Sequence, residues 1–409
     1  MFPRYITPRI FDALSDTPVV LLHGARQTGK STLVQHVISS GHPARYVTLD
    51  DTVVQAAARA NPADFLAAFG GPVVIDEVQR VPELFLAIKA AVDRDHKAGR
   101  FLLTGSADIL MLPHLAEFLA GRVEILPLWP LSQGEIAASP GNLIDPLFEA
   151  RPPLVDAKGN DDSIPGRVLA GGFPEAISRS SARRRSAWFD SYLSTILERD
   201  VREMANIEGL IEMPRLLALL ASRLCSLLNY AELSRSSGIP QTTLKRYMAL
   251  LEAAFLVQTL PAWSGNLSHR LTKSPKLLLC DTGLAAHLMG LEQPTALPNH
   301  PAGGALLECF VAMDLQKQAT WSETSVRLYH YRTSAGQDVD LVLERPDGAV
   351  VGVEVKSSST VTVSDFKGLR LLQEQLGSRF RCGVVLYRGF QSIPFSEQLW
   401  AVPVQVLWK

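Results

Sequence analysis

One glycine-rich segment, residues 24–31, restricts what this chain can fold into more than any other feature. It reads Gly-Ala-Arg-Gln-Thr-Gly-Lys-Ser, follows an apolar run at 18–22 and precedes a helical stretch at 32–39. The two glycines let the backbone curl so that its N–H groups surround an anion at a helix N-terminus, where phosphate groups are favoured. The segment therefore predicts a phosphate-binding loop between a strand and a helix.

The rest of the N-terminal third fits a parallel α/β sheet around this loop. Short apolar runs alternate with helix-like stretches, which is the pattern of strands joined by crossover helices. The predicted strands lie at residues 19–22, 46–49, 73–75, 101–103 and 123–126.

The loop predicts a nucleoside triphosphate site, with ATP and Mg²⁺ as cofactors. Lys30 would supply a point charge to the phosphates, and the hydroxyl of Ser31 would bind Mg²⁺. The residues expected to bind the nucleotide are Gly24, Ala25, Arg26, Gln27, Thr28, Gly29, Lys30, Ser31 and Thr32.

Polar residues end the later strands of the predicted sheet. The run at 73–75 ends in Asp76 and Glu77, and packing gives no reason for two acids at the end of an apolar strand. We expect Asp76 to hold Mg²⁺ through its water shell and Glu77 to orient and polarise the attacking water. The next strand ends in Thr104, at the sheet edge that faces the ligand. Thr104, or Ser106, would contact the γ-phosphate or the water; a plain strand-end turn is the alternative.

In this order the elements resemble the AAA+ ATPases, which carry them on successive strands. The resemblance implies ATP hydrolysis and assigns Arg122, between a helical stretch at 110–120 and the last strand, to the arginine-finger position. In that role Arg122 would neutralise charge on the nucleotide of a neighbouring subunit, which implies a homo-oligomer. Whether it acts in cis or in trans stays open, and a local ion pair with Glu117 or Glu124 is the alternative.

Nearly the whole chain resembles the prokaryotic ATPases that carry a C-terminal domain of unknown function. The resemblance rests on GARQTGKST, VVIDEVQRVP, FLLTGS, GRVEILPLWPLSQGE, a Gly-Gly-Phe-Pro-Glu element at 171–175 and a Tyr…Glu-Arg-Asp element at 192–200. We assign no chemistry to the last two. The expected domains are an AAA+ ATPase domain at 1–140, a linker and helical lid at 141–205, a winged-helix-like domain at 206–295 and a nuclease-like domain at 296–409. Residues 139–166 predict an exposed loop.

Residues 230–260 have the spacing of a helix-turn-helix, and two apolar strand candidates follow, which predicts a winged helix. The exposed face of its second helix would carry Gln241, Thr242, Lys245 and Arg246, which could contact DNA bases and phosphates. A packing module is the alternative. Because 40 Lys and Arg balance 41 Asp and Glu, any nucleic-acid surface must be a local patch.

The hairpin at 338–356 brings acids together near the C-terminus. Counting through its turn places Asp340 opposite Glu354, with Lys356 on the same face. This set resembles the PD-(D/E)xK nuclease fold, which implies a second Mg²⁺ on Asp340 and Glu354, completed by Lys356 and by Glu308 of the preceding helix. A surface ladder of charges is the alternative, and cleavage stays open.

Composition excludes other classes. With 47% hydrophobic and 20% charged residues the chain is neither disordered nor collagen-like, and its four cysteines form no CxxC pair. The nine histidines form no HExxH motif, which argues against zinc. Neither a signal peptide nor an apolar stretch long enough to cross a bilayer is recognisable, so we expect a cytoplasmic protein without membrane contact.

Together these features predict an ATP-binding and ATP-hydrolysing protein, associated with DNA, with a nuclease-like module of uncertain activity. The alternative is a nucleotide-dependent switch that acts on protein partners and uses the nuclease-like fold only for binding.

Overall fold

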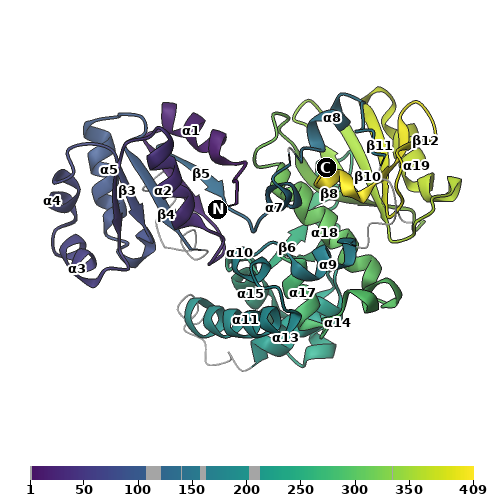
Figure 1. The fold of residues 1–409 in the computed structure, drawn as a ribbon, viewed down its shortest axis with the longest axis horizontal. Coiled ribbons are helices and arrows are strands. Elements are labelled where there is room, and N and C mark those ends of the chain that lie inside the picture. The colour runs from purple at the N-terminus through teal and green to yellow at the C-terminus, as the bar shows by residue number, and fades with distance from the viewer. Residues whose placement is uncertain (1, 107–120, 140, 157–162, 202–211, 334) are drawn as a thin grey trace.

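The computed structural model describes residues 2–106, 121–139, 141–156, 163–201, 212–333 and 335–409. Figure 1 shows an N-terminal sheet domain on the left, a C-terminal sheet domain at the upper right, and a helical middle domain below. In the parts of the chain that are described, no helix combines the length and the apolar character needed to cross a membrane.

The N-terminal domain is a parallel sheet of five strands in the order β2-β3-β4-β1-β5, so the predicted fold class is confirmed here. The strands are β1 (Val19–His23), β2 (Arg45–Thr48), β3 (Val73–Asp76), β4 (Phe101–Gly105) and β5 (Val123–Pro127). All five predicted strands are present, with ends that differ by one or two residues. The helical stretch expected at 110–120, which includes Glu117, lies outside the described residues.

Helices cover both faces of this sheet because the strand side chains alternate between two apolar cores. Val20 and Leu22 pack under α1 (Thr7–Asp16) and α2 (Lys30–Ser40). Val19 and Leu21 face the opposite core, which also receives α3 (Thr52–Ala60), α4 (Pro62–Ala67) and α5 (Leu84–Arg94). The 3-10 turn η1 (Val78–Arg80) follows β3.

The middle domain is mainly helical. Its elements are α9 (Ser163–Ala170), α10 (Pro174–Ile177), α11 (Ala182–Thr195), the π-helical turn η3 (Ile196–Val201), α13 (Met213–Ser222), α14 (Tyr230–Ser237), α15 (Gln241–Ala253), β6 (Val257–Leu260), α16 (Leu267–Thr272), β7 (Lys276–Leu279) and α17 (Thr282–Leu288). Helix α14 starts at the Asn229 cap and ends at Gly238, whose φ of +77° suits glycine. Strands β6 and β7 pair antiparallel, so two helices and a two-stranded ribbon follow one another.

The C-terminal domain is a mixed sheet of six strands in the order β12-β13-β11-β10-β9-β8. Strands β8, β9 and β10 are antiparallel neighbours, whereas β10, β11 and β13 run parallel. Helix α18 packs on one face and α19 on the other. The elements are η5 (Pro294–Asn299), α18 (Gly303–Gln318), β8 (Arg327–Arg332), β9 (Asp338–Glu344), β10 (Val350–Lys356), η6 (Val363–Phe366), α19 (Lys367–Leu376), η7 (Gly377–Arg379), β11 (Phe380–Tyr387), β12 (Ile393–Pro394), β13 (Leu399–Pro403) and η8 (Val404–Leu407).

The segment after β5 corrects one expectation. Helix α7 (Gln133–Ala137) follows β5, and helix α8 (Ile144–Phe148) lies where the sequence predicts an exposed loop at 139–166. Leu147 and Phe148 are buried and belong to the core that also contains β10 and β11. Residues 142–156 therefore pack on the C-terminal domain, because four apolar side chains in this polar stretch are enough to hold it there.

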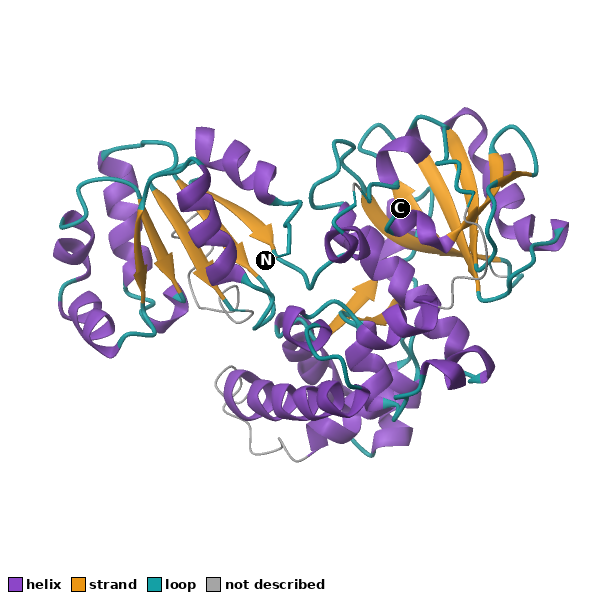
Figure 2. Ribbon diagram, viewed as in Figure 1, coloured by secondary structure: helices purple, strands orange, loops and turns teal. Residues whose placement is uncertain are grey.

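The middle and C-terminal domains share one continuous apolar core, which runs from α11 through α18 to the last turn of the chain. The N-terminal sheet has its own two cores. Figure 2 shows that the arrowheads of the N-terminal strands point toward the side where the middle domain lies. The carboxyl ends of these strands thus lie on the side of the middle domain.

Candidate functional site

The glycine-rich loop forms a tight turn between β1 and α2. Gln27 and Gly29 have φ angles of 61° and 93°, and a Cβ on Gly24 would lie 2.2 Å from the carbonyl oxygen of Leu128. The hydroxyl of Thr28 donates to the carbonyl of Ala25 at 2.9 Å, which closes the turn. Glycine is thus needed at 24 for space and is favoured at 29 for its backbone conformation.

Lys30 lies inside this turn and is buried. Its Nζ donates to the carbonyl oxygens of Gly24 and Ala25, each at 2.9 Å, which gives the buried ammonium acceptors within the protein. Burial and, second, the charge of Lys30 lower the pKa of His23 to about 4, so His23 is neutral near pH 7. Its ring packs edge-on against Phe255 of the middle domain, 5.2 Å between centroids.

The polar strand ends meet as the sequence order suggests. Thr104 is fully buried, and its hydroxyl donates to Asp76 and accepts from the backbone N–H of Glu77 at 3.0 Å. The other carboxylate oxygen of Asp76 accepts from the hydroxyl of Tyr46 at 2.7 Å. Burial, followed by the contact with Asp76, raises the pKa of Tyr46 to about 12. Thr104 thus holds the Asp76 carboxylate and the backbone of Glu77, and Tyr46 holds the other Asp76 oxygen, a contact that the sequence pattern did not indicate.

Glu77 begins a turn with left-handed backbone angles, φ 59° and ψ 45°. Such angles are uncommon for glutamate, and strained backbone of this kind gathers at functional sites. The amide of Gln79 donates to the Glu77 carboxylate at 2.5 Å and to the hydroxyl of Ser106 at 2.7 Å. Gln79, two residues after the acid pair, is a positioning residue that the sequence analysis missed.

These oxygen donors suit Mg²⁺, which prefers carboxylate, hydroxyl and water ligands. Ser31 is half-buried at the start of α2, and Asp76 is buried at the end of β3. Thr32 and Gln27 are exposed at the rim of the loop.

A hollow of about 580 Å³ lies between the loop and the middle domain. Its volume is in the range of small-molecule sites. The loop contributes Gln27, Gly29 and Thr32, and the middle domain contributes Pro174, Glu175, Arg179, Trp188, Ser191, Tyr192 and Thr195. This second wall was not predicted from the sequence, because α10 and α11 lie about 150 residues further along the chain.

One charged pair and one aromatic pair stand out on this wall. Arg179 Nη1 lies 2.9 Å from Glu175 Oε2, and about a quarter of the Arg179 side chain, 27%, is exposed. The rings of Trp188 and Tyr192 stack with an interplanar angle of 16° and 5.1 Å between centroids. The wall opposite the loop therefore carries the long, positively charged side chain of Arg179 and the flat rings of Trp188 and Tyr192.

The Gly-Gly-Phe-Pro-Glu element packs tightly against segments from other parts of the chain. Gly172 donates its N–H to the Asp281 carboxylate at 2.6 Å, and its carbonyl accepts from Leu131 N at 2.8 Å. A Cβ on Gly172 would lie 2.3 Å from the carbonyl oxygen of Leu131. Lys317 of α18 donates to the same carbonyl at 3.0 Å. The element thus joins the segment after β5 to α17 and α18, and brings α10 to the hollow.

Arg122 lies at the opposite end of the sheet from the loop. Its carbonyl accepts from Val19 N, the first residue of β1, whereas the loop follows the last residue of that strand. Its guanidinium pairs with Asp93 of α5 at 2.6 Å. A strand of this length spans about 15 Å, so Arg122 does not reach the loop of its own chain.

The predicted C-terminal carboxylates come together. The register pairs Val353 with Leu341 and so sets Asp340 opposite Glu354, whose Oε2 accepts from Asp340 N at 3.4 Å. Lys356 Nζ donates to Glu354 Oε1 at 2.8 Å, and α18 brings Glu308 to the same place. We name Glu308, Asp340 and Glu354 the carboxylate cluster.

A lysine that the sequence analysis missed enters this cluster. Lys276, the first residue of β7, lies 2.6 Å from Glu308 Oε1 and 3.1 Å from Asp340 Oδ1. Burial, together with the charge of Asp340, raises the pKa of Glu308 to about 8 and that of Glu354 to about 7. Burial lowers the pKa of Lys276, but the charges of Asp340 and Glu308 outweigh it and the net shift is upward.

The expected second Mg²⁺ site does not fit this arrangement. The ammonium of Lys276 already binds an oxygen of Glu308 and one of Asp340. Within the described ranges, no group of three or more His, Cys, Asp or Glu side chains is arranged to hold a metal ion. The sequence pattern indicated the three acids, but it could not show that a lysine from the middle domain lies among them.

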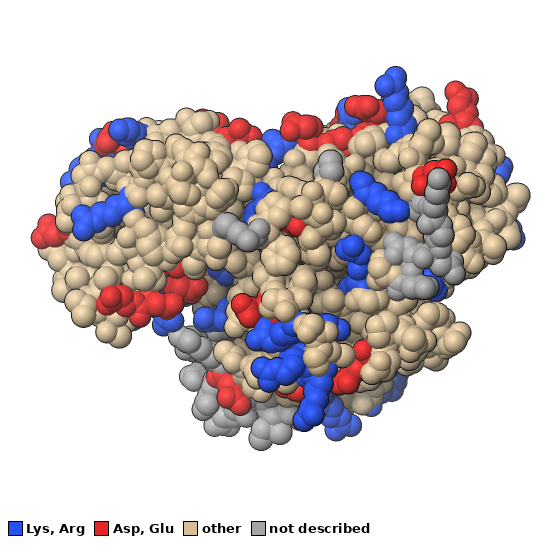
Figure 3. All heavy atoms as spheres, in the orientation of Figure 1, with Lys and Arg blue, Asp and Glu red and all other residues tan. Residues whose placement is uncertain are grey.

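The predicted outer face of α15 faces solvent. Gln241, Thr242, Lys245 and Arg246 are all exposed, and Lys245 lies 5.7 Å from the centroid of the Tyr230 ring. Figure 3 shows Lys and Arg gathered where Figure 1 places α11 and α13. Helix α11 carries the run 183–185 of three arginines.

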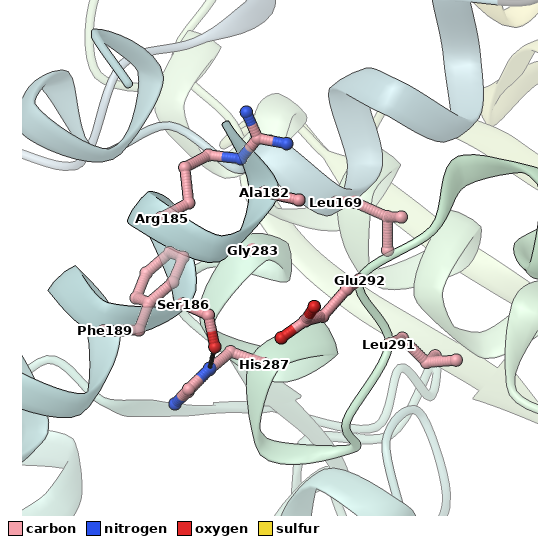
Figure 4. A pocket seen from close by; sticks show the side chains of 9 residues that line it. All are labelled: Leu169, Ala182, Arg185, Ser186, Phe189, Gly283, His287, Leu291 and Glu292. Atoms are coloured by element: carbon pink, nitrogen blue, oxygen red, sulfur yellow. Dashed lines mark hydrogen bonds between the residues drawn. The ribbon is translucent and has the colours of Figure 1, made fainter. Parts of the chain in front are cut away.

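One serine, histidine and aspartate series lies near α11. His287 Nδ1 is 3.1 Å from Ser186 Oγ, and His287 Nε2 is 3.1 Å from Asp190 Oδ1. Figure 4 shows Ser186 directed at His287 beside a small pocket. That pocket holds about 20 Å³, and His287 and Asp190 also line a wider hollow of about 620 Å³. The Asp190 side chain is 71% exposed, whereas the acid of a catalytic triad is buried, so we assign the series to the contact of α11 with α17 rather than to catalysis.

Comparison with known proteins divides the chain into three matched parts. Residues 16–137 match an AAA domain, residues 161–295 a domain of unknown function (DUF8612) and residues 303–407 another domain of unknown function (DUF4143). An uncharacterized protein of Mycobacterium tuberculosis is 34% identical over 401 residues, which cover 98% of this chain and 83% of the relative. An uncharacterized protein of Haemophilus influenzae is 24% identical over 230 residues, 53% of this chain and 52% of that protein.

Among solved structures, the Walker-type ATPase of Pyrococcus abyssi has a TM-score of 0.44 and 14% identity, over 70% of this chain and 96% of that one. AMPPCP-bound DnaA of Aquifex aeolicus has a TM-score of 0.30 and 15% identity, over 60% of this chain and 85% of that one.

Proposed function

Because the chain belongs to the family of the uncharacterized Mycobacterium tuberculosis protein and carries an AAA domain, we propose that it is an ATP-hydrolysing AAA-type ATPase. The observation that carries the proposal is that the ends of β1, β3 and β4 bring their polar residues to the same edge of the sheet. Lys30 is buried within the glycine-rich loop, while Thr104 holds Asp76 and Glu77 together beside it. Packing alone requires none of these contacts.

Each residue then has a separate task. The backbone of residues 24–32 surrounds the phosphates, and Lys30 moves its ammonium from loop carbonyls to phosphate oxygens. Ser31 and Asp76 hold Mg²⁺, which when bound supplies positive charge to the phosphates. Glu77 orients the attacking water, and Gln79 keeps its carboxylate in place.

The middle domain acts as the second wall of the nucleotide site. ATP would lie in the hollow between the loop and α11, with Arg179 near the phosphates and the stacked rings of Trp188 and Tyr192 beside its apolar part. Arg179 would leave its ion pair with Glu175, which adds little stability because Glu175 is exposed to water, and would bind a phosphate, which carries more negative charge. Nucleotide binding would thereby draw α10 and α11 toward the N-terminal domain.

The test is ATP turnover and ATP binding measured separately. Lys30→Ala is expected to lose both, whereas Glu77→Gln is expected to bind ATP and hydrolyse it about 10² to 10⁴ times more slowly, the usual share of a positioned base. Lys97→Ala removes an exposed lysine from the same domain and serves as the matched control, with turnover unchanged. Undiminished hydrolysis in folded Lys30→Ala would contradict the site.

A specific observation also favours DNA as a partner. Helix α15 presents Gln241, Thr242, Lys245 and Arg246 to solvent on one face, as a groove-reading helix would. We propose duplex DNA contact through this face, supported by the arginines at 183–185.

Fluorescence anisotropy with duplex DNA at several salt concentrations tests it. The pair Lys245→Ala and Arg246→Ala should weaken binding and reduce the slope of log K against log salt by about 1 per lost phosphate contact. Arg94→Ala with Lys97→Ala removes the same two residue types from the end of α5 and the loop that follows it, and should change neither. A protein with no measurable DNA binding would instead favour the switch that acts on protein partners.

A further inference from the structure

The carboxylate cluster contains a cation that belongs to the chain itself. Lys276 Nζ donates to Glu308 at 2.6 Å and to Asp340 at 3.1 Å, and the lysine side chain is only 7% exposed. Lys356 satisfies the third acid, Glu354, from the strand that also carries it. Two lysines therefore face one buried and two half-buried acids, and the lysine that links the two half-buried ones comes from the middle domain.

Contacts made by the residues before and after Lys276 in the sequence hold it in this position. Before it, Trp263 N donates to His330 O of β8 at 2.6 Å, and Arg270 binds both carboxylate oxygens of Glu344 at 2.5 and 2.8 Å. After it, β7 pairs with β6 in a regular register. Trp263, Arg270 and Lys273 thus bind the C-terminal sheet, β7 stays paired with β6, and the position of Lys276 follows from both.

A divalent metal and this ammonium compete for the same atoms. Mg²⁺ and Mn²⁺ need oxygen ligands within about 2.2 Å, arranged around a single point. Glu308 Oε1 and Asp340 Oδ1 already accept from Lys276, and Asp340 Oδ2 accepts from Val355 N at 3.0 Å. A second positive charge next to a buried ammonium would also repel it strongly in this low-dielectric place.

We propose that Lys276 is the resident cation of the carboxylate cluster. Its ammonium takes the place of a divalent metal and joins the middle domain to the C-terminal domain. The nuclease-like module therefore binds no divalent cation at these acids while β7 is in place. This inference does not depend on ATP hydrolysis at the N-terminal domain.

The experiment measures Mn²⁺ binding to the full-length, nucleotide-free protein by electron paramagnetic resonance. Binding at the cluster is the part that Asp340→Asn removes, which separates it from any binding at the glycine-rich loop. Wild type and Lys273→Met are expected to show no such binding; Lys273 is an exposed lysine three residues away and is the matched control. Lys276→Met is expected to gain it.

A charge-balanced variant covers the case in which Lys276→Met does not fold. Lys276→Met with Glu308→Gln replaces one base and one acid by neutral side chains of similar size and keeps Asp340 and Glu354 as ligands; it too should gain Mn²⁺ binding. Asp340-dependent binding in wild type would overturn the proposal, as would a folded single or double variant that gains none.

Thermal unfolding tests the joining role independently of metal. Lys276→Met should unfold at a lower temperature than wild type, because it leaves two half-buried acids without their cation, and the double variant should recover part of the loss. Unfolding of Lys276→Met at the wild-type temperature would refute the joining role.

Discussion

The close packing at Gly172 allows a prediction of stability whose magnitude follows from the structure. In Gly172→Ala the new Cβ would lie 2.3 Å from the carbonyl oxygen of Leu131, where ordinary contact begins near 3.4 Å. The backbone must therefore move by about 1 Å, at an overpacking cost of about 1 to 3 kcal/mol. The move also weakens the 2.6 Å hydrogen bond to the buried Asp281 carboxylate, worth about 1.5 to 3 kcal/mol for a charged partner.

We therefore expect Gly172→Ala to lower the free energy of unfolding by about 3 to 5 kcal/mol. Gly166→Ala is the matched control: it is the same chemical change in helix α9, where a Cβ would meet nothing within 4 Å. Alanine is a better helix former than glycine, so this control should raise stability by about 0.5 to 1 kcal/mol.

Urea unfolding followed by tryptophan fluorescence and by circular dichroism compares the three proteins. Both probes are needed because a chain of several domains need not unfold in one step. The reasoning would be refuted by a Gly172→Ala protein within 0.5 kcal/mol of wild type, or by equal destabilisation from Gly166→Ala.

Three further predictions concern the N-terminal domain and its walls. The unfolded chain protonates His23 near pH 6.5 but the folded chain only near pH 4, so stability is lost as pH falls between these values. Between pH 7 and pH 4 the free energy of unfolding should therefore fall by about 3 kcal/mol more in wild type than in His23→Gln. If Arg122 acts on a neighbouring copy, Arg122→Ala and Lys30→Ala should each lack ATP turnover, and mixing them should restore part of it; a mixture as inactive as its components contradicts action in trans. Arg179→Ala should bind a fluorescent ATP analogue about tenfold more weakly, whereas Arg184→Ala, from the exposed arginine run, should bind it as wild type does, and equal affinities of the two would exclude Arg179 from the site.

Several features could be predicted from the sequence because they depend on neighbouring residues. The glycine-rich loop needs only a strand, a turn and a helix in direct succession, and residues 19–40 supply all three. Asp340 and Glu354 could be paired across one short turn because strand side chains alternate with a period of two. The N-terminal strands were recognised from their apolar runs.

Other features depend on residues that meet only after folding. Tyr46 reaches Asp76 across 30 residues, Arg179 faces the loop from another domain, and Lys276 enters the carboxylate cluster from 32 residues before Glu308. Local composition does not say which sheet a polar segment will cover, which is why residues 142–156 were expected as a loop. Local chemistry set the kinds of groups available, whereas long-range packing decided which groups share a site and which charge each acid meets.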